Sequence, residues 1–197
     1  MRRGILAGAL LLACLLSLAG CGGGAAPERE ARRAYEAFLA GDLSLFAQEE
    51  LDRWGLEEWM GLVLVPGEAE YTYLDLDGDG VPELLLQRAD DPAGYNGVFR
   101  YEDGGLVCWQ SDGTEGSCRD YPLEDGTMVR QYDFDGTSYT LFRYRADGEE
   151  EIVATLREEP GPSYQIDGEE AEADAFSERL KSLVTDRILG RDRWTVL

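Results

Sequence analysis

The chain has 197 residues, 40 of them acidic and 18 basic, so its formal net charge is −22, and it contains no histidine. Such acidity argues against DNA, RNA or an anionic membrane surface as a binding partner, because phosphates would be repelled. The lack of histidine excludes Ser-His-Asp and Cys-His catalysis and histidine-ligated transition metals.

Residues 1–20 have the features of a signal peptide. Arg2 and Arg3 precede the apolar run from Ile5 to Leu18, which is too short to span a membrane as a mature helix. Loss of this segment would remove two arginines and no acids, which lowers the net charge from −22 to −24.

The apolar run ends in Leu18-Ala19-Gly20-Cys21, which resembles a bacterial lipobox. The resemblance implies that Cys21 is lipidated and becomes the first mature residue, anchored on the extracytoplasmic face of the cell membrane. Cleavage as an ordinary secretory signal is the alternative. Residues 21–27 would then form a flexible tether, since glycine follows Cys21 three times.

Residues 28–197 are long enough for a single domain with a substantial core. Residues 28–66 are predicted to be helical, because apolar side chains recur at helical spacing and Gly41 provides a stop. The first of these helices has its predicted apolar face at Ala31, Ala34, Tyr35, Phe38 and Leu39.

A calcium-type loop is predicted over residues 75–83, between two strand-like segments. Its sequence is Asp75-Leu76-Asp77-Gly78-Asp79-Gly80-Val81-Pro82-Glu83. Alternate aspartates direct oxygens to one centre, and Gly80 permits the turn that brings them together. The predicted ligands of one calcium ion are the side chains of Asp75, Asp77, Asp79 and Glu83 and the carbonyl of Val81. An acidic turn without a metal is the alternative.

The loop is not an EF-hand, because its twelfth position is Leu86 and its flanks read as strands. It resembles the calcium loops of FG-GAP and integrin-type repeats. A propeller would need this motif at a fixed period, and it occurs once.

Residues 69–167 are predicted to form a β-meander, because short strand-like segments alternate with Asp-Gly pairs that favour type I′ turns. An amphipathic helix is predicted over 170–190, with Phe176, Leu180, Leu183, Val184 and Ile188 on its apolar face. The expected fold class is α+β, in which helices from both ends pack on one antiparallel sheet. The Asp-Gly pairs begin at Asp103, Asp112, Asp125, Asp135, Asp147 and Asp167.

Two cysteines remain outside the signal and the lipobox, Cys108 and Cys118. Cysteines of exported proteins often pair, so a local disulfide across the intervening loop is one prediction. Unsuitable strand register would prevent it.

Four aromatic side chains could form a platform for a sugar or peptide: Trp54, Trp59, Trp109 and Tyr95. The alternative is that the tryptophans fill the core between helices and sheet.

The order of elements is similar to that of a loosely defined set of uncharacterised bacterial surface lipoproteins. The resemblance lies in residues 34–41, 74–86 and 164–168, and it implies export and a calcium loop. From the sequence we expect a non-enzymatic binding or accessory module whose partner is an envelope protein or glycan. The alternative is a glycan-processing enzyme of the cell envelope that uses acidic carboxylates.

Overall fold

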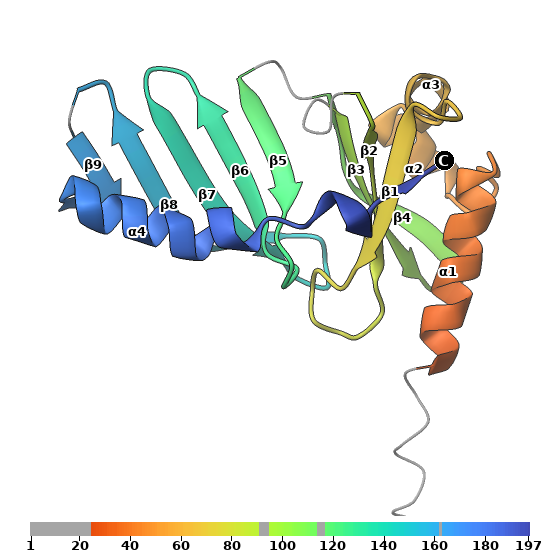
Figure 1. The fold of residues 1–197 in the computed structure, drawn as a ribbon. Helices are drawn as coiled ribbons and strands as arrows, with labels where there is room; N and C mark the ends of the chain where they lie inside the picture. Colours follow the sequence, from red (N-terminus) through yellow and green to blue (C-terminus); the bar gives the residue numbers. More distant parts are fainter. Residues whose placement is uncertain (1–24, 91–94, 114–116, 162) are drawn as a thin grey trace, which may run out of the picture.

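The computed structural model describes residues 25–90, 95–113, 117–161 and 163–197. These residues form an α+β fold in which helices near both ends of the described chain pack on antiparallel sheets (Figure 1). This confirms the predicted fold class. The helices are α1 (Ala25–Leu39), α2 (Gln48–Trp54), α3 (Leu56–Val63) and α4 (Ala173–Leu183), with short 3-10 turns η1 (Thr185–Arg187) and η2 (Arg191–Arg193).

The strands follow one another as antiparallel neighbours, but they form two sheets rather than the single sheet that we expected. The first sheet has the order β11-β1-β2-β3-β4, with β1 (Ala69–Leu74), β2 (Glu83–Arg88), β3 (Tyr95–Glu102), β4 (Gly105–Gly113) and β11 (Thr195–Val196). The second has the order β10-β9-β8-β7-β6-β5, with β5 (Cys118–Pro122), β6 (Met128–Asp133), β7 (Thr137–Tyr144), β8 (Glu150–Glu159), β9 (Ser163–Ile166) and β10 (Glu169–Ala171).

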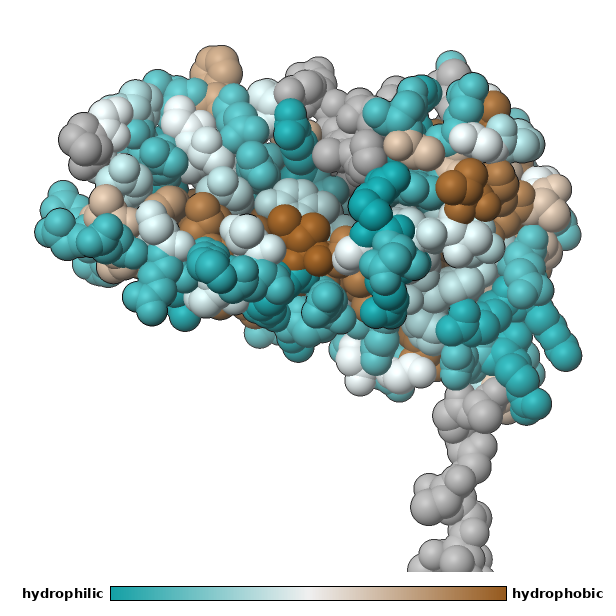
Figure 2. Space-filling model, in the orientation of Figure 1, coloured by the Kyte–Doolittle hydropathy of each residue, from teal (hydrophilic) through white to brown (hydrophobic). Residues whose placement is uncertain are grey.

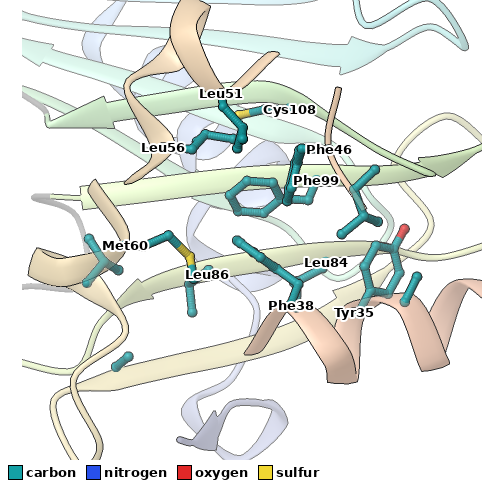
Figure 3. Close-up of a cluster of buried hydrophobic side chains, with 14 of the residues drawn as sticks. Tyr35, Phe38, Phe46, Leu51, Leu56, Met60, Leu84, Leu86, Phe99 and Cys108 are labelled. Atoms are coloured by element: carbon teal, nitrogen blue, oxygen red, sulfur yellow. The ribbon is translucent and has the colours of Figure 1, made fainter. Parts of the chain in front are cut away.

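The three N-terminal helices cover one face of the first sheet. Amphipathic α1 contributes Tyr35 and Phe38, both fully buried, and Phe38 contacts Phe99 with ring centroids 4.6 Å apart (Figure 3). Edge and tilted contacts among aromatic rings add to the hydrophobic gain from burial.

Helix α4 covers one face of the second sheet. Phe176, Leu180 and Val184 pack on a cluster that includes Leu141 and Leu156 from the sheet. The helix ends at Leu183, short of the predicted 190, and Ile188 is exposed rather than part of its buried stripe. The chain turns away at this point because backbone hydrogen bonds tie residues 187 and 189 to the end of β5.

A third apolar cluster joins the remaining faces of the two sheets. Leu85 and Val98 from the first sheet meet Met128, Phe142 and Tyr144 from the second. Division into two sheets allows this extra core to form, because each sheet then has one face against helices and part of the other against its neighbour. The loop between β1 and β2 lies at this junction.

Several Asp-Gly pairs form the predicted turns. At Asp103, Asp135 and Asp167 both the aspartate and the following glycine have positive φ, as a type I′ turn requires. Gly113 instead is the last residue of β4, so the pair at Asp112 belongs to the end of this strand rather than to a turn.

Candidate metal site in the loop between β1 and β2

The candidate site is a hairpin loop whose ends are fixed by strand pairing. Leu74 at the end of β1 pairs with Glu83 at the start of β2. Asp75 directly follows β1, so the strand register places the first and last acidic residues of the motif next to each other. Gly78 and Gly80 both have positive φ, which lets the intervening chain turn back.

Carboxylates organise the loop by accepting hydrogen bonds from its own backbone. Asp75 accepts from Gly78 N at 2.8 Å through Oδ1 and from Gly80 N at 3.0 Å through Oδ2. Asp77 Oδ1 accepts from Asp79 N at 3.1 Å, and Asp79 Oδ1 accepts from Val81 N at 2.7 Å. The loop is therefore closed by short-range polar contacts that do not require a bound ion.

The structure brings three of the four predicted side-chain ligands to one centre. One carboxylate oxygen from each of Asp75, Asp77 and Glu83 lies within 4.8 Å of the others. The side chain of Asp79 is more exposed than those of Asp77 and Glu83, and it lies beside this group. Val81 packs its side chain against the first apolar cluster, and its N–H donates to Asp79.

Glu83 is buried, with 1 % of its surface exposed. Burial raises the pKa of its carboxyl to about 8. A hydrogen bond from Leu76 N to Oε2, 2.8 Å long, acts in the opposite direction, and the negative charge of Asp77 raises the pKa further. The site therefore disfavours a further uncompensated negative charge.

Sequence reasoning missed Arg100, which inserts its guanidinium into the acidic group. It forms a salt bridge with Asp77 and donates from Nη2 to Asp79 Oδ2 at 2.9 Å, while its Nη1 lies 3.7 Å from Glu83 Oε1. The four carboxyl groups and one guanidinium leave a formal charge of −3 when all are ionised. This excess can attract a divalent cation, although such a cation would compete with Arg100.

The position of Arg100 follows from the pairing of β2 with β3. Leu84 pairs with Phe99, so the next step along the ladder places Arg100 opposite Glu83. The only signal in the sequence is a cation within the strand-like segment 98–101, and its partner depends on strand register.

The loop is also packed into the junction between the sheets. Leu76 is buried in the third apolar cluster. A Cβ at Gly126, in the turn between β5 and β6, would lie only 2.3 Å from the carbonyl oxygen of Asp75. Backbone from the second sheet thus touches the start of the loop.

Two residues of the predicted aromatic platform, Trp54 and Trp109, have described side chains, and they lie in separate clusters. Trp54 packs at the edge of the first apolar cluster, with the Arg53 guanidinium 5.1 Å from its ring centroid. Trp109 belongs to the third cluster, where its ring centroid lies 5.0 Å from that of Tyr144 and 5.3 Å from Arg100 Cζ. The side chains of Trp59 and Tyr95 lie outside the described part of the structure. Trp54 and Trp109 therefore do not form a common surface.

No disulfide joins Cys108 to Cys118 in the structure, contrary to the predicted pairing. Cys108 is buried in β4 of the first sheet, and its Sγ donates to Gln110 O at 3.2 Å, whereas Cys118 begins β5 of the second sheet. The two cysteines therefore lie on strands of different sheets. Cys21, the predicted lipidation site, lies outside the described residues.

A small cavity beside the junction has a volume of about 10 Å³. Its lining includes Leu85, Asp120, Met128 and Trp194. This is room for about one water molecule and too little for a sugar.

Among the described helices, none combines the length and the apolar character needed to cross a membrane. Comparison of the chain with models of protein families, with curated proteins and with solved structures gave no match.

Proposed function

We propose that the protein is an extracytoplasmic calcium-binding lipoprotein, anchored in the cell membrane through Cys21 and acting as a non-enzymatic binding or accessory module. The observation that supports calcium binding most directly is the convergence of Asp75, Asp77 and Glu83, since one carboxylate oxygen of each lies within 4.8 Å of the others. Their spacing along the chain also matches the alternate-aspartate pattern of calcium loops.

The chemistry of the loop favours calcium over magnesium. Calcium accepts six to eight oxygen ligands in flexible geometry, whereas magnesium demands a near-ideal octahedron and retains water. Asp75, Asp77, Asp79 and Glu83 would supply carboxylate oxygens, and Val81 would supply its carbonyl.

A structural role for the ion fits the surroundings of the loop. Leu76 is buried between the two sheets, so order in the loop supports their junction. The alternative of an acid-carboxylate enzyme has less support, because the buried carboxylates Glu70, Glu83 and Asp120 all lie near arginines.

Thermal unfolding with calcium, magnesium or chelator tests whether the loop binds calcium. If the dissociation constant is about 0.1 mM, about 1 mM calcium should add roughly 1.4 kcal/mol to the free energy of unfolding. Magnesium should add less. Asp77→Asn should abolish the calcium effect, whereas Asp174→Asn, at an acid in the first turn of α4, should retain it. An unchanged melting temperature after chelation would refute the calcium proposal.

Mass spectrometry of the membrane fraction tests the anchor. The mature chain should begin at Cys21 and carry acyl chains, while an unmodified, secreted chain would refute lipidation. Capture from intact envelope through the native anchor would then show whether the partner is a protein or a glycan.

A further inference from the structure

We propose that Arg100 and Trp109 couple occupancy of the loop between β1 and β2 to the packing of the turn between β7 and β8. When calcium binds the carboxylates, Arg100 leaves them, and the turn loosens because Trp109 lies in contact with both. This inference rests on the proposed calcium site and concerns how the rest of the protein responds when that site is filled.

The buried position of Arg100 depends on the acids of the loop. Its side chain is 14 % exposed, and its guanidinium contacts Asp77 and Asp79. Its Nε is buried and has no hydrogen-bond partner among the described residues. A guanidinium in such a place is stable only while nearby carboxylates supply the counter-charge. A divalent ion held by the same carboxylates repels the guanidinium, which then gains more from hydration than from burial.

The loop is open to an ion from the solvent. Residues 78–80 are exposed. Figure 2, in the orientation of Figure 1, shows hydrophilic and neutral residues where this loop reaches the surface below the first sheet. Calcium can therefore reach the carboxylates while the junction between the sheets stays closed.

Trp109 connects Arg100 to the second sheet. It is the extra residue of a β-bulge in β4, since the residues on either side of it pair with consecutive residues of β3. The centroid of its ring lies 5.3 Å from Arg100 Cζ and 5.0 Å from the ring centroid of Tyr144 in β7. Departure of the guanidinium removes a cation–π attraction, so the indole is then held less firmly.

The turn between β7 and β8 rests directly on this indole. Gly148 has φ of +79°, and a Cβ at this position would lie only 2.6 Å from Trp109 Cδ1. Within the turn, Gly148 N donates to Arg145 O at 2.8 Å, and Arg145 N donates to Glu149 O at 2.9 Å. The path from the loop to the turn thus consists of two side chains in contact, and Arg100 has two states that calcium shifts.

Fluorine NMR of the full chain labelled with fluorotryptophan tests this coupling. Replacement of Trp109 by Phe assigns its signal. Calcium, added to metal-free protein at constant ionic strength, should shift the Trp109 signal over the same calcium range that raises the melting temperature. The Trp54 signal should stay in place, because that ring lies beside Arg53 in the first apolar cluster.

Two arginine variants distinguish the proposed path from a general effect of calcium. Arg100→Gln removes the cation from the Trp109 ring, so the Trp109 signal of this variant should not move when calcium binds. Arg53→Gln removes a similar contact, in which the guanidinium lies 5.1 Å from the ring centroid of Trp54. This control variant should retain the full response at Trp109.

Hydrogen exchange of the unaltered chain measures the response of the turn, whether or not Arg100→Gln folds. Exchange of the Gly148 N–H should become about fivefold faster with calcium, which corresponds to the loss of one cation–ring contact. The Asp167 N–H, at another Asp-Gly turn of the same sheet, donates to Thr155 O at 2.8 Å. Its exchange should not become faster.

The outcomes separate the coupling from the calcium site itself. A melting temperature that rises with calcium, without any change at Trp109 or Gly148, would overturn the coupling but not the site. A Trp109 shift of equal size in Arg100→Gln would also overturn the coupling, because Arg100 would not carry the effect. No change in the melting temperature or in these signals would overturn both.

Discussion

A salt bridge joins Arg100 of β3 to Asp77, whose side chain is 1 % exposed within the loop between β1 and β2. The same guanidinium reaches Asp79 and Glu83, so the protein supplies its own cation to this group of acids. A calcium ion would seek the oxygens that Arg100 already contacts. Calcium affinity and metal-free stability should therefore change in opposite directions when Arg100 is altered.

Replacement of Arg100 by Gln should destabilise the metal-free protein by about 3 kcal/mol, because buried carboxylates lose their counter-charge. The same variant should gain more stability from calcium than the wild type does. Urea unfolding with chelator and with calcium measures both effects. Arg100→Lys keeps the positive charge, so its metal-free stability and its stabilisation by calcium should both lie between those of the wild type and of Arg100→Gln. A variant that loses stability but gains no additional stabilisation from calcium would contradict the competition.

Glu83 should make metal-free stability fall as pH rises. Its pKa is raised from 4.5 to about 8, first by burial and then by Asp77 and Asp79, against the hydrogen bond from Leu76 and the charge of Arg100. The folded state therefore binds more protons than the unfolded state between these values. This contribution is fully present below about pH 4.5 and is lost by about pH 8, with a slope of at most about 1.4 kcal/mol per pH unit.

Glu83→Gln isolates this effect, since the amide retains an oxygen for Leu76 N but does not titrate. Both proteins are unfolded in chelator from pH 5 to pH 8. The unfolding free energy of the variant, relative to that of the wild type, should rise steadily with pH. A difference that stays constant with pH would contradict the raised pKa. In the wild type, calcium binding should release protons in this range, because the ion requires the ionised carboxylate.

The sequence pattern predicted those site residues that lie close together along the chain. Asp75 and Glu83 could be assigned together because a short hairpin fixes their separation. Arg100 could not, because its contact depends on the register between β2 and β3. The division into two sheets was missed for a similar reason, since alternation of strands and turns does not show where pairing stops. Ile188 fitted the helical period, but the chain leaves the helix at Leu183 to meet the end of β5.

Gly126 should be needed for the contact between the second sheet and the loop. It has φ of +81°, and an added Cβ would lie 2.3 Å from Asp75 O. Gly161 has φ of +104° but open space around the added atom. Both Ala variants should incur the left-handed strain of about 1 kcal/mol, and Gly126→Ala should lose roughly 2 kcal/mol more because backbone must move.

Chemical denaturation compares these two glycine variants directly. If calcium binds the loop, Gly126→Ala should also reduce the stabilisation by calcium, because Asp75 is displaced, while Gly161→Ala should not. Equal losses of stability in both variants would show that the second sheet does not hold the loop.

The side chain of Gln110 links the two sheets through hydrogen bonds, and these should contribute to stability. From β4 its Nε2 donates to Asp120 Oδ2 of β5 at 3.0 Å, and its Oε1 accepts from the hydroxyl of Tyr144 in β7 at 2.8 Å. Asp120 also accepts from Arg130 Nη2 at 2.8 Å, so the carboxylate is fully engaged although it is buried.

Gln110→Glu would keep the shape and the contact with Tyr144 but would place two carboxyl groups together in a buried site. We expect a loss of about 3 kcal/mol at pH 7, because an unpaired charge is buried, with recovery toward pH 5 as the new carboxyl takes up a proton. The pKa of the new carboxyl should be raised in the folded state, so the stability of the variant should fall as pH rises from the unfolded-state pKa to the folded-state pKa.

Gln131→Glu is the matched control, since Gln131 donates to Asp133 at 2.9 Å in an exposed position. That substitution should cost no more than about 1 kcal/mol and vary little with pH. Urea unfolding of both variants at pH 5 and pH 7 separates the cases, and similar losses would mean that the Gln110 connection contributes no more to stability than a surface pair.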